Sequence, residues 1–175
     1  TVYFNKDRTD LFTTLEVKIP GQKGMTLCQQ TAKQVAAESA TYMIRYQTHP
    51  LYSSAWRYSY VDGPIAGQKV LKIESVPVKV GLTIEELNKD YFANPKVSKY
   101  VKTRYLPAIG ANYNRNGSAS RLGTSRGRGS NGDYWSATED GGHFYFLGFR
   151  SDFVTIDAMA PSNTAAIRPF RNKLQ

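Results

Sequence analysis

Cysteine and histidine are scarce in this chain, and this scarcity limits the chemistry that it can carry. Cys28 is the single cysteine among 175 residues, and there are only two histidines. An intrachain disulfide, a thiolate metal cluster and a mechanism that needs two thiols are therefore excluded. His49 and His143 lie far apart in the sequence, and the acidic residues do not follow the spacing of a calcium loop. We expect neither a metal ion nor a cofactor.

Long apolar runs are also missing. No segment approaches the roughly 20 apolar residues that a helix needs to cross a bilayer, so no membrane span is expected. The chain begins at Thr1 and shows no signal-peptide pattern there. We therefore expect that any export signal was removed upstream of Thr1.

Acidic residues are outnumbered, with 14 Asp and Glu against 23 Lys and Arg. The net charge of +9 favours an acidic partner, which could be nucleic acid, an anionic glycan or an anionic membrane surface. The imbalance is greatest between Asp90 and Asp133, where no acidic residue occurs. This interval contains a long polar loop at 112–132, and loops of that length are usually functional or disordered. The basic residues between Asp90 and Asp133 are Lys96, Lys99, Lys102, Arg104, Arg115, Arg121, Arg126 and Arg128.

Aromatic residues are plentiful, with 12 Tyr, 8 Phe and 2 Trp, which favours strands and binding surfaces. Small and apolar residues at helical spacing nevertheless predict a helix over 26–46, and they are Cys28, Ala32, Val35, Ala36, Ser39 and Met43. A capping box of Thr83 and Glu86 predicts a second helix over 83–92, with a further turn or two toward Val101. Strands are predicted at 2–4, 15–19, 70–73, 76–80, 134–138, 144–149, 153–156 and 165–170. This order of elements predicts an α+β fold.

Four short motifs occur in order in the closing third of the chain. They are YLPAIG at 105–110, GDYWSAT at 132–138, FYFLGF at 144–149 and IRPFR at 167–171. Their order and spacing resemble the FISUMP type of domain, whose pattern is approximately LPAAG, a loop, GYYWSST, a YxLxF strand and VRPVR. The resemblance covers about residues 103–172.

This resemblance implies a C-type-lectin-like fold, with two helices and a mainly antiparallel twisted sheet. It also implies an exported bacterial protein of the extracellular or outer-membrane surface, such as a lipoprotein or fimbrial subunit. We expect one domain over 1–175; the alternative is a small β-rich domain at 1–82 followed by a lectin-like domain at 83–175. The calcium-binding signatures of sugar-binding C-type lectins are absent, so calcium-dependent sugar binding is not expected.

The sequence motifs of the chain give little support for enzymatic chemistry. Residues 127–132 fit the GxGxxG string of dinucleotide sites, but that string requires a following helix, whereas an aromatic strand is predicted here. No GxSxG elbow or nucleophilic triad is found. Tyr134 and Trp135 are most simply core and rim aromatics. We therefore predict that the protein is not an enzyme.

The predicted function is noncovalent binding or adhesion at a cell surface, through the basic loop and the strand that follows the Trp motif. The ligand would be a glycan or protein on a host or neighbouring cell, since Arg binds carboxylate or sulfate bidentately. Two alternatives remain: a hypervariable receptor-binding protein of a diversity-generating retroelement, and a basic nucleic-acid-binding domain. The candidate binding residues are Asn112, Tyr113, Asn114, Arg115, Arg121, Arg126, Arg128, His143, Tyr145 and Arg150.

Overall fold

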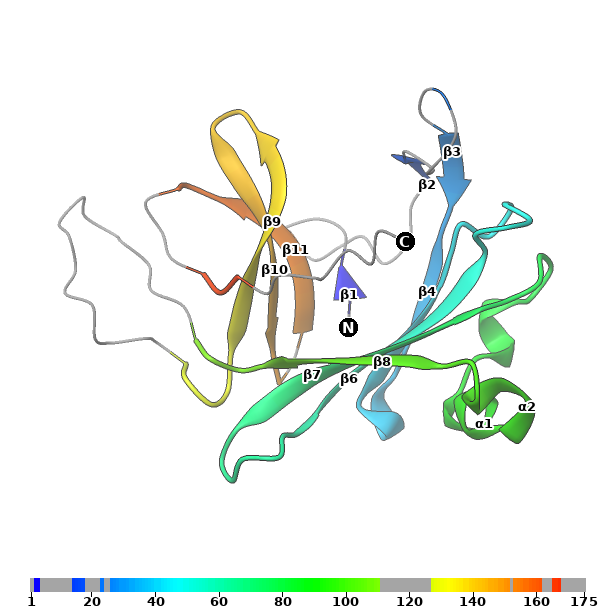
Figure 1. The fold of residues 1–175 in the computed structure, drawn as a ribbon, viewed down its shortest axis with the longest axis horizontal. Coiled ribbons are helices and arrows are strands. Elements are labelled where there is room, and N and C mark those ends of the chain that lie inside the picture. The colour runs from blue at the N-terminus through cyan, green and yellow to red at the C-terminus, as the bar shows by residue number, and fades with distance from the viewer. Residues whose placement is uncertain are drawn as a thin grey trace, which may run out of the picture.

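Strands dominate the computed structural model of the chain (Figure 1). The structure describes residues 2–3, 14–17, 23, 26–110, 127–151, 153–161 and 165–167. Its strands form a five-stranded sheet, a four-stranded sheet and a two-stranded ribbon of β2 and β3. They are β1 (Val2–Tyr3), β2 (Thr14–Val17), β3 (Thr26–Gln29), β4 (Thr31–Val35), β5 (Ala40–Arg45), β6 (Ser54–Asp62), β7 (Lys69–Pro77), β8 (Lys102–Pro107), β9 (Gly132–Asp140), β10 (His143–Arg150) and β11 (Phe153–Met159).

The five-stranded sheet is an antiparallel meander in the order β4-β5-β6-β7-β8. Each strand pairs with its neighbour in the chain, so β8 lies against β7 although the helices intervene in sequence. Side chains alternate between the two faces of a strand, and both faces here are partly buried. One face carries Met43 and Leu71, while the other carries Tyr42 and Ile44.

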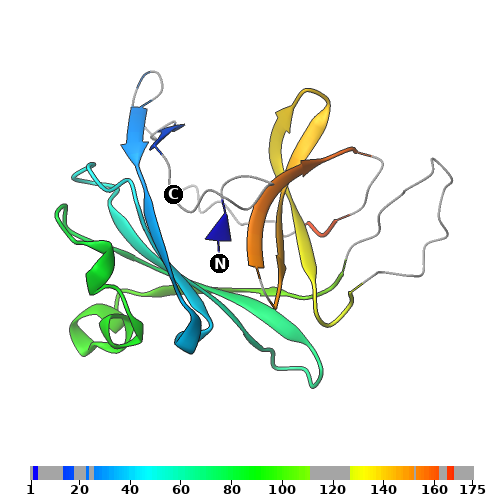
Figure 2. The same ribbon diagram turned by 180° about the vertical axis from the view of Figure 1, so that it is seen from behind.

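The four-stranded sheet has the order β1-β11-β10-β9 and packs on one face of the meander. Its strand β1 runs parallel to β11, so the first and last of the described strands lie in one sheet (Figure 2). Tyr134, Phe149 and Val154 from this sheet share a buried cluster with Met43 and Leu71 of the meander. This apolar contact between the sheets is the first core of the protein.

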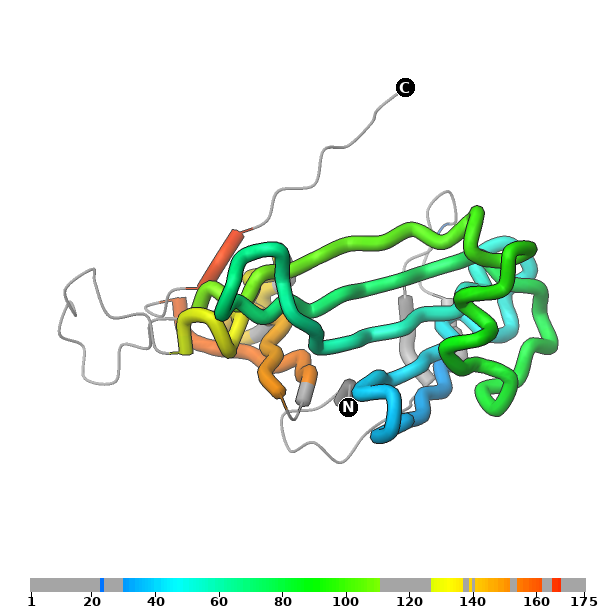
Figure 3. Tube along the Cα trace, turned by 90° about the horizontal axis from the view of Figure 1, so that it is seen from below, coloured from blue at the N-terminus to red at the C-terminus, as the bar shows by residue number. Residues whose placement is uncertain are grey.

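A second core lies on the opposite face of the meander. Here Leu87 and Phe92 pack against Tyr42, Ile44 and Val76. Phe92 belongs to the short helical segment at 84–98, and Leu87 lies within that segment. Figure 3 shows this segment at one end of the five strands and β9, β10 and β11 at the other. The helical elements are η1 (Ala36–Glu38), η2 (Ile84–Glu86), α1 (Lys89–Ala93) and α2 (Pro95–Ser98).

The predicted α+β, C-type-lectin-like fold is wrong: the described chain is predominantly β, and its two α-helices have five and four residues. The long helix expected over 26–46 is instead β3, β4, η1 and β5. A spacing of four residues fits one turn of a helix, but it also keeps residues on one face of a strand. Strand pairing decided between the two, since Ala32 lies opposite Met43 in the β4–β5 ladder.

The capping box of Thr83 and Glu86 is confirmed, but it begins a shorter element than predicted. The Glu86 carboxylate accepts hydrogen bonds from the Thr83 backbone N–H at 2.8 Å and hydroxyl at 2.9 Å. These bonds lower the pKa of Glu86. The element ends as a 3₁₀ turn, because Leu87 returns to extended backbone. Asn88 then caps α1 by accepting a hydrogen bond from the Tyr91 N–H at 2.8 Å.

The three strands predicted at 134–138, 144–149 and 153–156 are confirmed as β9, β10 and β11. The two expected at 70–73 and 76–80 are one strand, β7, which ends at Pro77. Of the strand expected at 165–170, the structure describes a bridge between Ala166 and Tyr134. Strand β6 falls in a segment where no strand was predicted.

Removing the Tyr134 hydroxyl is expected to lower the stability of the sheet packing. This hydroxyl donates to the Pro107 carbonyl at 2.7 Å, and the side chain is buried. Tyr134→Phe leaves that carbonyl without this donor, so we expect a loss of about 1–2 kcal/mol in the free energy of unfolding. Urea denaturation measures it. Tyr100→Phe, on an exposed ring, should change stability by under about 0.5 kcal/mol, and equal effects of both variants would contradict this role for Tyr134.

Candidate ligand-binding cleft

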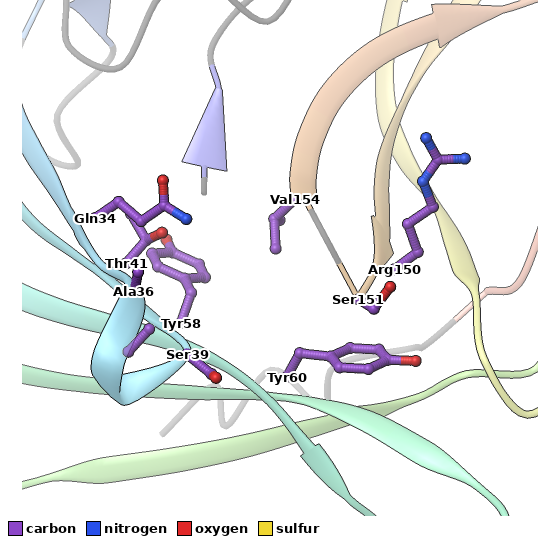
Figure 4. A pocket seen from close by; sticks show the side chains of 10 residues that line it. Gln34, Ala36, Ser39, Thr41, Tyr58, Tyr60, Arg150, Ser151 and Val154 are labelled. Atoms are coloured by element: carbon purple, nitrogen blue, oxygen red, sulfur yellow. The ribbon is translucent and has the colours of Figure 1, made fainter.

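A cleft of about 300 Å³ lies between the meander and the four-stranded sheet (Figure 4). Strands β4, β5 and β6 with the η1 turn form one wall, while the end of β10 and the start of β11 form the other. The cleft occurs where the two sheets diverge beyond their shared apolar core. Its lining residues are Gln34, Ala36, Ser39, Ala40, Thr41, Tyr58, Tyr60, Arg150, Ser151 and Val154.

Two tyrosines from β6 form the floor of the cleft. Tyr58 and Tyr60 are two residues apart, so both point to the same face of the meander. Figure 4 shows their rings on one side of the gap, with Val154 and Ser151 on the other. The Tyr60 hydroxyl donates to the Ser130 carbonyl at 2.7 Å. Tyr58 stacks nearly parallel on Trp56, with ring centroids 6.1 Å apart. These contacts fix both rings before any ligand arrives.

Both phenols stay neutral near pH 7. Burial is the main cause that raises the pKa of Tyr58 above its ordinary value, and the positive charge of the Arg45 guanidinium opposes it. Burial likewise raises the pKa of Tyr60, against the attraction of the Lys69 ammonium. The two side chains are therefore hydroxyl groups and ring faces for a ligand, rather than bases.

One end of the cleft is polar. Gln34 and Thr41 are register partners on β4 and β5, and Thr41 in turn lies opposite Tyr58. The Thr41 side chain is 1% exposed, and its hydroxyl oxygen has no hydrogen-bond partner within the described structure. Figure 4 places the Gln34 amide beside this group, at the opening between the sheets. A buried hydroxyl without a partner is costly, so it favours a ligand that supplies one.

Arg150 lines the end of the cleft opposite Gln34, but its guanidinium points away from the tyrosines (Figure 4). It shares a strand face with Phe146 and Gly148, which alternate with the core-facing Leu147 and Phe149. None of the ten lining residues is Asp, Glu, His or Cys. The cleft can therefore stack rings and exchange hydrogen bonds, but its lining offers no pair of groups for general acid and base catalysis.

Of the ten predicted binding residues, six lie outside the described structure: Asn112, Tyr113, Asn114, Arg115, Arg121 and Arg126. Arg128 is exposed in the turn at 127–130, whose Ser130 carbonyl binds Tyr60. The described end of the basic loop is thus held beside the cleft.

The other predicted residues lie on β10, at its two ends. His143 begins the strand and Tyr145 follows it, whereas Arg150 is the last residue, about 23 Å from His143 along the strand. His143 is exposed, with a ring nitrogen 3.4 Å from the Gly141 carbonyl oxygen. The structure therefore brings Arg128 and Arg150 to the side of the cleft and leaves His143 and Tyr145 away from it.

Sequence reasoning missed the cleft residues on β4, β5 and β6. The available signal was the alternation of Trp56, Tyr58 and Tyr60, which is typical of a strand with one aromatic face. No such signal pointed to Gln34 and Thr41, because they meet at the cleft only through the pairing of β4 with β5.

Two further observations bear on other kinds of site. The string at 127–132 leads into strand β9, whereas a dinucleotide fingerprint needs a helix at that point. Among the described residues, no three His, Cys, Asp or Glu side chains are grouped so that they could hold a metal ion. The part of the chain that the structure covers also contains no helix with the length and apolar character of a bilayer span.

Comparison with known proteins gives a family but no described activity. No curated protein and no solved structure matches the chain significantly. One family model, described as a domain of unknown function (DUF8237), matches residues 1–170. Because this match spans nearly the whole sequence, the chain belongs to the DUF8237 family.

Proposed function

We propose that the protein is a noncatalytic binding module that holds a saccharide unit in the cleft between its two sheets. The observation that carries the proposal is the lining of that cleft, in which fixed tyrosine rings adjoin amide and hydroxyl groups without an acid. A sugar presents both apolar C–H faces and many hydroxyls, so it uses both kinds of group at once.

The size and chemistry of the cleft support a small polar ligand. A volume of about 300 Å³ is at the lower end of the usual range for ligand sites. Tyr58 and Tyr60 offer ring surface, while Gln34 offers both a donor and an acceptor. The Thr41 hydroxyl gains a partner if a ligand hydroxyl reaches it after a small movement of its neighbours.

The charge of the chain indicates how the ligand arrives and what it carries. A net charge of +9 accelerates encounter with anionic glycans, and Arg128 stands in the turn beside Tyr60. We place this binding at the surface of a bacterial cell, after export, where the partner is a glycan on a host or neighbouring cell. Adhesion, as part of a fimbria or a larger surface protein, is the role that follows.

Loss of the Tyr58 ring is expected to weaken glycan binding strongly. A glycan array of neutral and acidic oligosaccharides identifies a bound probe, and calorimetry then compares Tyr58→Ala with wild type. We expect affinity to fall about 10- to 100-fold, as for a central aromatic contact. Tyr58→Phe retains the ring and should lose less.

Tyr100→Ala is the matched control, because that ring is 58% exposed on the turn after α2 and does not line the cleft. Circular dichroism checks that each variant is folded. The proposal fails if wild type binds no oligosaccharide, or if folded Tyr58→Ala binds the identified probe as tightly as wild type does.

A further inference from the structure

The aromatic floor of the cleft continues beyond it along β6. Trp56, Tyr58 and Tyr60 occupy alternate positions, and all three pack beside the same core cluster. At about 3.3 Å per residue, the row spans about 13 Å from Tyr60 to Trp56. Trp56 does not line the cleft, so the row offers a surface for more than the unit bound inside.

A guanidinium is held at the outer end of this row. The Arg45 Nε donates to the Gln30 side-chain oxygen at 3.0 Å, and the guanidinium lies 5.1 Å from the Trp56 ring centre. A guanidinium has five N–H donors, so Arg45 can bind a carboxylate or sulfate while it keeps contacts of this kind.

The strand at the sheet edge supplies two more cations to the same face. Arg104 and Lys102 precede Leu106 on β8 by two and four residues, so their side chains lie on the same face as that of Leu106. The Leu106 side chain packs into the core between the sheets. Both cations are exposed and therefore stand on that face beyond the core. In the ladder, β8 lies two strands from β6, with Arg104 in the row of Tyr58 and Lys102 in the row of Trp56.

Acidic groups are scarce on this face, and the one that it carries is paired with a lysine. The strands β4 to β8 contain only two, Asp62 and Glu74. Asp62 lies on this face two residues after Tyr60, at the end of β6, where it pairs with Lys69. Glu74 lies on the opposite face between Lys72 at 2.7 Å and Arg57 at 3.5 Å. The face that carries the aromatic row therefore has basic groups on both sides of it.

We infer that the ligand is an extended acidic glycan, with carboxylate or sulfate groups along its chain, which enters the cleft with one unit and continues over Tyr58 and Trp56. This inference rests on the proposed function and names its ligand class. The anionic groups lie against Arg45, Arg104 and Lys102, and the sugar rings lie along the aromatic row. A single nucleic-acid strand is the competing ligand, since its bases and phosphates use the same kinds of group, and a dT12 probe tests it.

The test is a series of chain lengths. Oligogalacturonates of two and six units probe carboxylates, heparin-derived fragments of the same lengths probe sulfates, and maltohexaose is the neutral control. Isothermal titration should show the acidic hexamer bound at least about tenfold more tightly than its dimer, with the gain reduced by added salt. Maltohexaose should show no such gain.

Variants test whether the tighter binding of the acidic hexamer depends on the aromatic row and on the cations beside it. Trp56→Ala and Arg45→Gln should each reduce the affinity for the acidic hexamer more than the affinity for the dimer, although both residues also adjoin Tyr58 of the cleft. The double variant Lys102→Ser/Arg104→Ser changes exposed side chains only, so it keeps the test open if Trp56→Ala does not fold. Lys99→Gln is the control for charge, because Lys99 is exposed at the end of α2, where it lies 4.9 Å from the Tyr100 ring centre.

The possible outcomes separate failure of the extended site from failure of the cleft proposal. A hexamer bound no more tightly than the dimer, or folded variants that lose dimer and hexamer alike, overturns the extended site and leaves the cleft proposal standing. Failure of every oligosaccharide to bind overturns both. A dT12 strand that binds more tightly than any oligosaccharide also overturns both, in favour of nucleic-acid binding.

Discussion

Phe149→Ala is expected to lower the free energy of unfolding by about 3–5 kcal/mol, the usual cost of removing a buried phenylalanine ring. The Phe149 side chain is 2% exposed and belongs to the core between the two sheets. It stacks nearly parallel on Tyr134, with centroids 6.2 Å apart, and meets Tyr60 edge-on at 6.4 Å. The alanine leaves a cavity where the four-stranded sheet joins the meander, so contacts to both sheets are lost.

Equilibrium urea denaturation, followed by tryptophan fluorescence, measures this loss. Ile156→Ala is the matched control: it removes an apolar side chain of the same sheet that is 38% exposed, so it should cost under about 1.5 kcal/mol. Because Tyr60 loses its neighbour, glycan affinity should also fall in Phe149→Ala. A loss of stability no greater than that of the control would show that the sheets do not depend on this ring.

The closing strands could be predicted because their pattern was local. Residues 134–138 and 144–149 are rich in aromatics, and the paired glycines Gly141 and Gly142 lie in the turn between β9 and β10. Such segments form a hairpin between neighbours in the sequence, which needs no distant partner. The same holds for Thr83 and Glu86, whose capping box is complete within four residues.

The first half of the chain could not be predicted in this way. The helical pattern of Cys28, Ala32 and Ala36 uses spacings of four, which are also multiples of the strand period. The chain turns at Ser39, with φ of 47°, and β5 then carries Ala40, Tyr42 and Ile44 on one face. That face is buried only because the helical segment at 84–98 covers it, and this packing cannot be read from the sequence of β5.

The candidate cleft is a product of pairing between distant segments. Tyr60 is 70 residues before Ser130, whose carbonyl accepts its hydrogen bond. Gln34 and Thr41 reach the cleft through a hairpin, while Val154 comes from the last described strand. The scarcity of acid in the sequence indicated a basic binding surface, but residue types alone could not say which basic side chains share a face with Tyr58.

Gly132 does not have the role that the last glycine of a GxGxxG dinucleotide motif has. The string at 127–132 places it last among three glycines, where a dinucleotide fold needs close packing of a helix. In this protein Gly132 begins β9 directly opposite Phe149. A Cβ atom added there would lie 2.4 Å from the Phe149 Cζ and 2.5 Å from its Cε1. The glycine is therefore required by the ring that packs over it.

Gly132→Ala is accordingly expected to lower the free energy of unfolding by about 3 kcal/mol, near the upper end of the cost of overpacking a core. The φ of Gly132 is not in the left-handed region, so the cost comes from the clash and not from backbone strain. A double-mutant cycle tests this cause. In a Phe149→Ala background the added methyl group enters the vacated space, and its cost should fall below about 1 kcal/mol, a coupling of about 2 kcal/mol. Additive losses would instead place the requirement for glycine in the backbone of β9.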